Sequence, residues 1–148
     1  MKPFHQQSWD ARYAKMGDES EAKFDALFPN SAPFGLNRPP VNLSQVPAFI
    51  RYMPDRLMHD RLVECMGVGK DQTLKLKLDK FVCLGHWDAV CPTWLFVWDS
   101  HRKRWMWMPV HDLLPVVALM ETKEFPEGKL YYPIDVNDLI VEWHDDAS

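Results

Sequence analysis

The sequence lacks the marks of several common protein classes. No stretch approaches the roughly 18 consecutive apolar residues that a membrane span needs, and the first residues contain no apolar segment typical of a secretory signal. Three cysteines are too few for a disulfide framework, so we expect free thiols and a cytoplasmic protein. Only six glycines occur, and Gly67 and Gly69 lack the rest of a nucleotide-binding loop.

The overall composition is that of an ordinary globular domain. Hydrophobic residues make up 47% and charged residues 26% of the 148 positions, which excludes wholesale disorder. We expect one domain over residues 1–148. The net charge of −4 disfavours a general polyanion-binding protein, although the distribution of charge matters more than its sum. Twelve prolines divide the chain into short elements and disfavour a bundle of long helices.

The pattern of apolar residues predicts alternating helices and strands. Phe24, Leu27 and Phe28 have helical spacing, and Pro29 ends that helix. The expected elements are a helix from about residue 18 to 28, a hairpin of strands 49–53 and 61–66, a helix over 71–84, strands at 93–98 and 104–108, a short helix over 111–121, and a strand at 129–132. This order predicts an α/β fold with a mixed central sheet flanked by helices.

The hairpin carries the most informative pair of residues. A turn at His59 and Asp60 places Asp55 opposite Glu64, on one face, with Cβ atoms about 4.5–5.5 Å apart. Two opposed carboxylates repel each other, and a bound Mg²⁺ or Mn²⁺ removes that conflict because such ions prefer carboxylate oxygens. The alternative is a solvated acidic pair at a strand end. A three-residue loop in place of the two-residue turn would shift the register and separate the pair.

The order of these motifs resembles the PD-(D/E)XK nuclease superfamily. The likeness covers residues 18 to 108 and consists of Glu21 on the first helix, Pro54-Asp55, and Glu64-x-Met66-Gly67, followed by a lysine-rich helix and an apolar strand. Within the superfamily it is nearest to phage-type endonucleases and Holliday-junction resolvases. The resemblance implies a restriction-endonuclease-like fold with a C-terminal extension over 109–148. It also implies metal binding by Glu21, Asp55 and Glu64, and a host-cytoplasmic location if a phage encodes the chain.

One position departs from the superfamily pattern. Met66 stands where a lysine is expected, and a thioether cannot stabilise an anion. Either catalysis has been lost or another cation enters the site. On the expected helix over 71–84, Lys77 and Lys75 lie at the edges of the apolar face, whereas Lys80 falls on the far side. We therefore expect Lys77 first and Lys75 second as the catalytic cation, with Lys70 third.

Basic residues cluster around the proposed site despite the negative net charge. The candidates for DNA contact are Arg38, Arg51, Arg56, Lys70, Arg102, Lys103 and Arg104. Two functions follow as hypotheses. The first is a Mg²⁺-dependent DNA endonuclease that hydrolyses phosphodiester bonds, specific for branched DNA and acting as a homodimer. The second is a catalytically silent protein that binds DNA or a protein partner through the same fold. A lysine within reach of Asp55 and Glu64 would favour the first.

Overall fold

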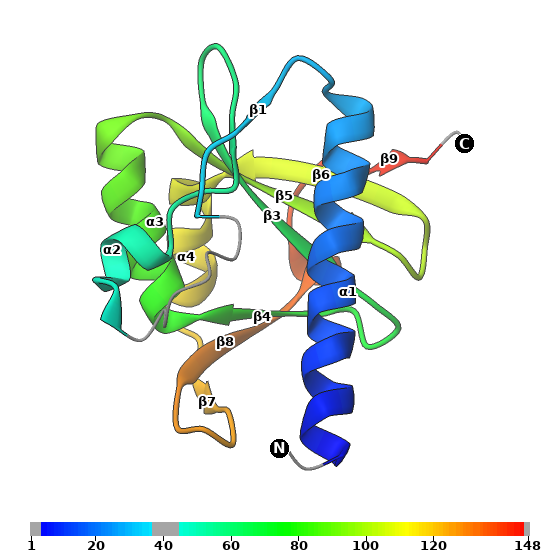
Figure 1. Cartoon of the computed structure of the whole chain (residues 1–148), viewed down its shortest axis with the longest axis vertical. Coiled ribbons are helices and arrows are strands. Elements are labelled where there is room, and N and C mark those ends of the chain that lie inside the picture. The colour runs from blue at the N-terminus through cyan, green and yellow to red at the C-terminus, as the bar shows by residue number, and fades with distance from the viewer. Residues whose placement is uncertain (1–3, 37–44, 147–148) are drawn as a thin grey trace.

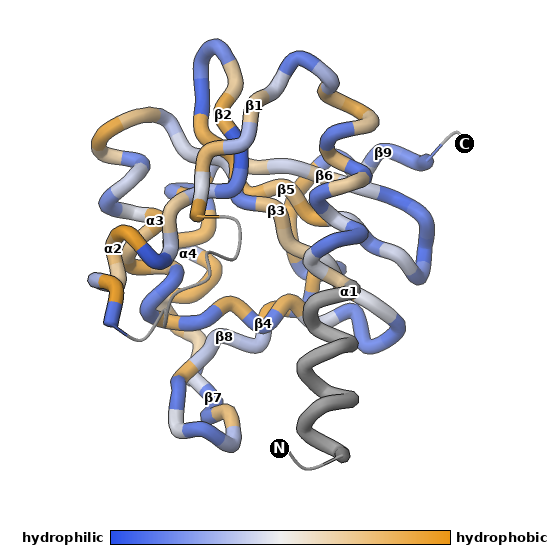
Figure 2. The backbone as a smooth tube through the Cα atoms, viewed as in Figure 1, coloured by the Kyte–Doolittle hydropathy of each residue, from blue (hydrophilic) through white to orange (hydrophobic). Residues whose placement is uncertain are grey.

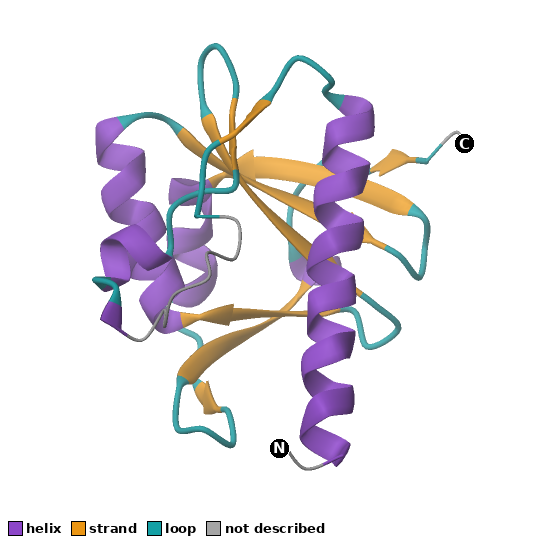
Figure 3. Cartoon of the chain, in the orientation of Figure 1, coloured by secondary structure: helices purple, strands orange, loops and turns teal. Residues whose placement is uncertain are grey.

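The computed structural model describes the backbone of residues 4–36 and 45–146, with side chains from residue 16 onward. Its elements follow one another along the chain as α1 (Phe4–Leu27), β1 (Ala32–Pro33), α2 (Ala48–Arg51), β2 (Arg56–Leu57), β3 (Leu62–Val68), β4 (Thr73–Lys77), α3 (Leu78–Val90), β5 (Thr93–Asp99), β6 (Arg104–Pro109), η2 (Val110–Leu113), α4 (Leu114–Val117), β7 (Lys123–Glu124), β8 (Leu130–Asp135), η3 (Val136–Asp138) and β9 (His144–Asp145). Figure 1 shows their arrangement, and Figure 3 separates helices from strands. The expected α/β class is confirmed.

Two β-sheets form the framework. A six-stranded sheet has the order β1-β2-β3-β5-β6-β9, and a three-stranded sheet has the order β4-β8-β7. The pairing of β3 with β5 is parallel, and the other pairings are antiparallel. A parallel pair needs a crossover connection, which β4 and α3 supply here. The large sheet is therefore mixed, as expected.

Helix α1 covers one face of the large sheet (Figure 1). Its Phe24 is fully buried with Val63 and Cys65 of β3 and with Phe96 and Trp98 of β5. The alternation along β5 places Leu95 and Val97 on the opposite face. Each fully buried aromatic or branched side chain contributes roughly 1.5–3 kcal/mol, so this layer anchors α1 firmly.

The opposite face of the large sheet packs on α3, α4 and the small sheet. Its core contains the buried Leu84 of α3, Met106 of β6, Leu113 of η2 and Ile134 of β8. The resemblance assigns residues 109–148 to a C-terminal extension. In the structure, residues 109–146 form β7, β8 and β9 and supply part of this core.

The prediction of a helix over 71–84 is wrong in its first half. Residues Thr73–Lys77 form β4, and the helix begins only at Leu78. Leu74 and Leu76 are buried and alternate with half-buried Lys75 and Lys77, a period of two that Figure 2 displays along β4. The helix also continues beyond the predicted end at residue 84, to Val90.

Two further boundaries differ from the predictions. The expected strand 49–53 is instead the short helix α2. The hairpin partner of β3 is therefore reduced to the two residues of β2. Pro47 precedes α2, and Phe49 stacks on Trp87 of α3, which holds this helix in place. Helix α1 begins at Phe4 rather than near residue 18 and ends at Leu27, just before the predicted stop.

No helix in the described part of the chain is long and apolar enough to cross a membrane. The cysteines Cys65, Cys83 and Cys91 are free, as expected.

Candidate active site

The predicted hairpin register is confirmed. Arg56 pairs with Val63 and Leu57 with Leu62, and the amide of Met58 donates to the carbonyl of Arg61 at 2.8 Å to close the turn around His59 and Asp60. Asp55 lies one residue before β2, so this register extends to place it beside Glu64. The Asp55 carboxylate accepts a hydrogen bond from the amide of Cys65 at 2.9 Å, which fixes it against β3.

Glu64 is the most buried carboxyl group of the site, with 3% of the residue exposed. Burial raises the pKa of Glu64 well above its ordinary value, and the nearby charge of Asp55 raises it further. The raised pKa favours the protonated form of Glu64 next to the Asp55 carboxylate. A divalent cation can take the place of that proton, because its preferred ligands are carboxylate oxygens.

Glu21 lies on α1 and accepts a hydrogen bond from Nη1 of Arg56, which also donates to the main-chain carbonyl of Asp55. Burial raises its pKa, and the charge of Asp55 adds to the effect, which places Glu21 within electrostatic reach of Asp55. The association of Glu21, Asp55 and Glu64 as metal ligands stays a prediction. Among the residues that the structure describes, however, no three His, Cys, Asp or Glu side chains converge closely enough to form a metal-binding cluster.

Arg56 connects α1 to the hairpin. Its guanidinium donates to both carboxylate oxygens of Asp25, at 2.8 and 3.0 Å, and to Glu21 at 3.1 Å. Only 8% of Arg56 is exposed. The sequence suggested this arginine as a DNA contact, but its donors are engaged by acidic side chains, and it positions Glu21 beside Asp55.

The cation at the carboxylate pair is Lys80. Its Nζ lies 3.7 Å from Oε2 of Glu64, and the charge of Glu64 raises the pKa of Lys80. Because α3 begins at Leu78, its buried face contains Cys83 and Leu84, and Lys80 lies on that face at helical spacing. Val82, directly before the buried Cys83, is 49% exposed.

The sequence interpretation missed Lys80 because it treated β4 and α3 as one helix. If Leu74 is counted as part of the buried helix face, Lys80 falls on the opposite face. In the helix that begins at Leu78, the buried residues are Cys83 and Leu84, and Lys80 lies on their side. The alternation of leucine and lysine from Leu74 to Lys77 was the available signal for a strand at this point.

The lysines predicted to be catalytic lie on β4 in the small sheet. The Nζ of Lys75 is 5.9 Å from the ring centroid of Tyr131, and the Nζ of Lys77 is 5.8 Å from that of Phe125. Neither forms an ion pair with Asp55 or Glu64. Met66 lies on β3 two residues beyond Glu64, on the same face, and packs against the core beneath α3.

The remaining basic candidates fall into three groups. Lys70, Arg102 and Lys103 are exposed in turns, and Arg51 is half-buried at the end of α2. Arg104 is engaged within the protein, because it donates to Asp99 at 2.9 Å and lies 3.9 Å above the ring of Trp143. Arg38 lies outside the described residues.

Cys65 is not a nucleophile at this site. Burial raises the pKa of its thiol, followed by the charges of Asp55 and Glu64, so the thiol stays protonated. It is a small buried residue that belongs to the core cluster beneath α1.

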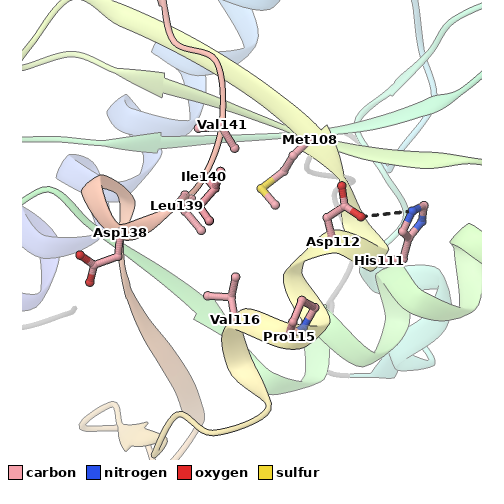
Figure 4. Close-up of a pocket in the computed structure, with 9 residues that line it drawn as sticks. All are labelled: Met108, His111, Asp112, Pro115, Val116, Asp138, Leu139, Ile140 and Val141. Atoms are coloured by element: carbon pink, nitrogen blue, oxygen red, sulfur yellow. Dashed lines mark ion pairs between the residues drawn. The ribbon is translucent and has the colours of Figure 1, made fainter.

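A separate hollow lies away from the carboxylates. It is lined by Met108, His111, Asp112, Pro115, Val116, Asp138, Leu139, Ile140 and Val141, and Figure 4 shows these side chains with the His111–Asp112 ion pair of 3.4 Å. None of the residues of the carboxylate site lines this hollow.

Comparison with known proteins does not place the chain in a family. No family model, no curated protein and no solved structure matches it.

Proposed function

We propose that this protein is a divalent-metal-dependent DNA endonuclease that hydrolyses phosphodiester bonds at the Asp55–Glu64–Lys80 site. The observation that carries the proposal is the position of Lys80, 3.7 Å from Glu64, at the strand pair where the hairpin register places Asp55 beside Glu64. A carboxylate pair with an adjacent lysine is the set of groups that the PD-(D/E)XK resemblance implies. Here the lysine comes from α3 in place of Met66.

The donor set fits Mg²⁺ or Mn²⁺. Asp55 and Glu64 offer carboxylate oxygens, and hard divalent cations commonly use one or two carboxylates together with water and a substrate phosphate. The bound ion would lower the pKa of a water molecule and neutralise charge on the phosphate. Glu21, which approaches Asp55 from α1, would help to order the waters around the ion.

The protein's own residues supply the remaining chemistry. In the reaction, a water oxygen loses a proton and forms a bond to phosphorus, the bond from phosphorus to the leaving sugar oxygen breaks, and that oxygen takes up a proton. Negative charge grows on the phosphoryl oxygens during this step. The ammonium group of Lys80 is held in place by Glu64 and stabilises that charge without needing to reorganise.

The substrate class in this proposal is branched DNA, as the resemblance to junction resolvases implies. Cutting two strands of a junction needs two sites, so the proposal includes a homodimer. Shape rather than base sequence would then govern affinity, because contacts to phosphates position a protein without reading bases.

A cleavage assay tests the proposed function. The wild-type chain is incubated with a labelled four-way junction, a linear duplex and a single strand, each in Mg²⁺, Mn²⁺ or EDTA. We expect metal-dependent cutting of the junction and no cutting by Asp55→Asn. Equal cutting of all three DNAs would retain the nuclease and remove the junction specificity. If the protein binds DNA but cuts none of the substrates with either metal, it is the catalytically silent protein.

A further inference from the structure

A buried donor near the proposed active site has no partner. Among the described side chains, the Nε of Arg51 is a buried nitrogen without a hydrogen-bond acceptor. Buried polar groups in native proteins are nearly always satisfied, so an unsatisfied guanidinium nitrogen indicates a ligand that completes it. Arg51 ends α2, and its Cζ lies 5.1 Å from the ring centroid of Tyr52.

The packing of α2 on α3 directs Arg51 toward the site. Phe49 stacks on Trp87 with ring centroids 4.3 Å apart, and the indole of Trp87 donates to the carbonyl of Phe49 at 2.9 Å. Tyr52 connects Arg51 to the catalytic lysine, because the Nζ of Lys80 lies 6.0 Å from the same ring. Arg51 and Lys80 therefore approach a single aromatic ring.

Lys77 adds a third cation to this region. It occupies the last position of β4, directly before α3, and is half-buried. Burial lowers the pKa of Lys77, and the charges of Lys80, Lys129 and Arg51 lower it further, while Glu127 acts in the opposite direction. The fold thus brings like charges together at a cost in free energy that a bound anion would remove.

The other cations of the region already have carboxylate partners. Lys80 pairs with Glu64, and Lys129 lies 3.7 Å from Asp79. Within the described part of the chain, neither Arg51 nor Lys77 forms an ion pair. Two unpaired cations, one with an orphaned buried donor, remain beside the site.

We infer that Arg51 and Lys77 form a binding subsite for a backbone phosphate of the DNA substrate, next to the phosphate that is cut. The inference rests on the proposed function. A guanidinium binds a phosphate through two parallel hydrogen bonds, and an ammonium adds a point charge. The charge of Lys80 acts on Lys77, so the two side chains lie in the same region. The subsite therefore takes a phosphate that neighbours the one at Lys80, and its role is to position the strand.

The test measures how DNA affinity depends on salt, in EDTA, so that no cleavage is needed. Fluorescence anisotropy follows a labelled junction and a labelled duplex bound to the wild type, Arg51→Met, Lys77→Met and the matched control Lys75→Met, which alters the other half-buried lysine of β4. Each lost phosphate contact reduces the slope of log affinity against log salt by about 0.9 on duplex DNA. We expect that reduction in Arg51→Met and Lys77→Met and an unchanged slope in Lys75→Met.

Two further arms identify the source of the phosphate and guard against misfolding. Unlabelled single-stranded DNA should displace the labelled DNA far more effectively than inorganic phosphate does, because the subsite binds a phosphate that is part of a polynucleotide. Equal displacement would overturn the assignment to a polynucleotide. Arg51→Lys keeps the positive charge and should retain most of the slope, and thermal melting checks that each variant is folded.

The outcomes separate this inference from the proposed function. Unchanged slopes in both Arg51→Met and Lys77→Met, in a wild type that cuts DNA, would overturn the subsite and leave the nuclease. Reduced slopes in a wild type that cuts nothing would support the subsite and remove the nuclease. A wild type that binds no DNA would overturn both.

Discussion

The Nζ of Lys80 lies 3.7 Å from Oε2 of Glu64, although the two residues belong to different layers of the fold. Glu64 comes from a central strand of the large sheet, and Lys80 from the helix that crosses over to the next strand. The contact places a cation beside Glu64, although Met66 stands at the position of the superfamily's lysine. It is the basis of the first prediction.

Replacing Lys80 should remove cleavage and spare metal binding. Lys80→Met keeps the length of the side chain and removes the charge that stabilises the transition state, so we expect a loss on the order of 10²–10³ in cleavage rate. Lys75→Met, on the small sheet, should cut at the wild-type rate. Rates are measured on the junction under single-turnover conditions. A Lys80→Met protein that cuts normally would exclude Lys80 from the reaction.

Metal binding should depend on Glu64 and release protons. Because the pKa of Glu64 is raised above its ordinary value, Mn²⁺ must compete with a proton for this carboxylate, and apparent affinity should rise with pH. Isothermal titration in two buffers of different ionisation enthalpy measures both the affinity and the proton release. Glu64→Gln should bind Mn²⁺ at least tenfold more weakly. Equal binding by the two proteins would remove the carboxylate pair as a metal site.

Stability without metal should fall as the pH rises. The pKa of Glu64 is raised above its ordinary value of 4.5, so the folded protein retains a proton that the unfolded chain loses. The stability that comes from this group is fully present below 4.5 and is lost as the pH rises through the raised pKa. Urea unfolding across that range, in EDTA, measures it. Glu64→Gln, which stays neutral throughout, should show a smaller decline, and an equal decline would contradict the assignment.

Arg56 should contribute to both stability and activity. Arg56→Met leaves Glu21 and Asp25 without their partner, and we expect a loss of about 1–3 kcal/mol in the free energy of unfolding. Because the Asp25 side chain is 50% exposed and solvent screens its charge, we expect a loss of stability at the low end of this range. Arg102→Met, at an exposed turn position, should change stability by less than about 0.5 kcal/mol. Cleavage should also slow in Arg56→Met, because Glu21 is no longer held beside Asp55.

Met66 offers a complementary rescue. Residue 66 lies on the face of Glu64, two residues along β3, where the superfamily pattern has its lysine. In the Lys80→Met background, Met66→Lys should restore part of the cleavage rate. In the wild-type background it should crowd the existing cation and slow the reaction. A folded double variant as inactive as Lys80→Met would show that position 66 cannot serve the site.

The sequence predicted the hairpin register correctly because a two-residue turn determines it. Once His59 and Asp60 form the turn, every opposed pair follows, and the pairing of Arg56 with Val63 confirms the assignment. The mixed α/β class and the α1 stop before Pro29 were also predictable from local signals.

The position of Lys80 beside Glu64 was not predictable by the same route. A helix and a strand meet at Lys77–Leu78 without a glycine or a loop between them. The boundary depends on β4 finding β8, a partner more than fifty residues away along the chain. The expected strand 49–53 failed for a similar reason, because α2 owes its place to the contact between Phe49 and Trp87. Both outcomes depend on tertiary packing, which a periodicity in one segment does not contain.

The pairing of β4 with β8 has a consequence for protein synthesis. Within the described sheet, β8 is the strand that pairs with β4, which leads directly into the helix of Lys80. A ribosome releases Lys80 well before it releases Leu130–Asp135. Until then the nascent chain contains Asp55 and Glu64, but β4, which leads into the helix of Lys80, has no strand to pair with. On the proposed function, the protein therefore becomes able to cut DNA only after Leu130–Asp135 have left the ribosome and paired with β4.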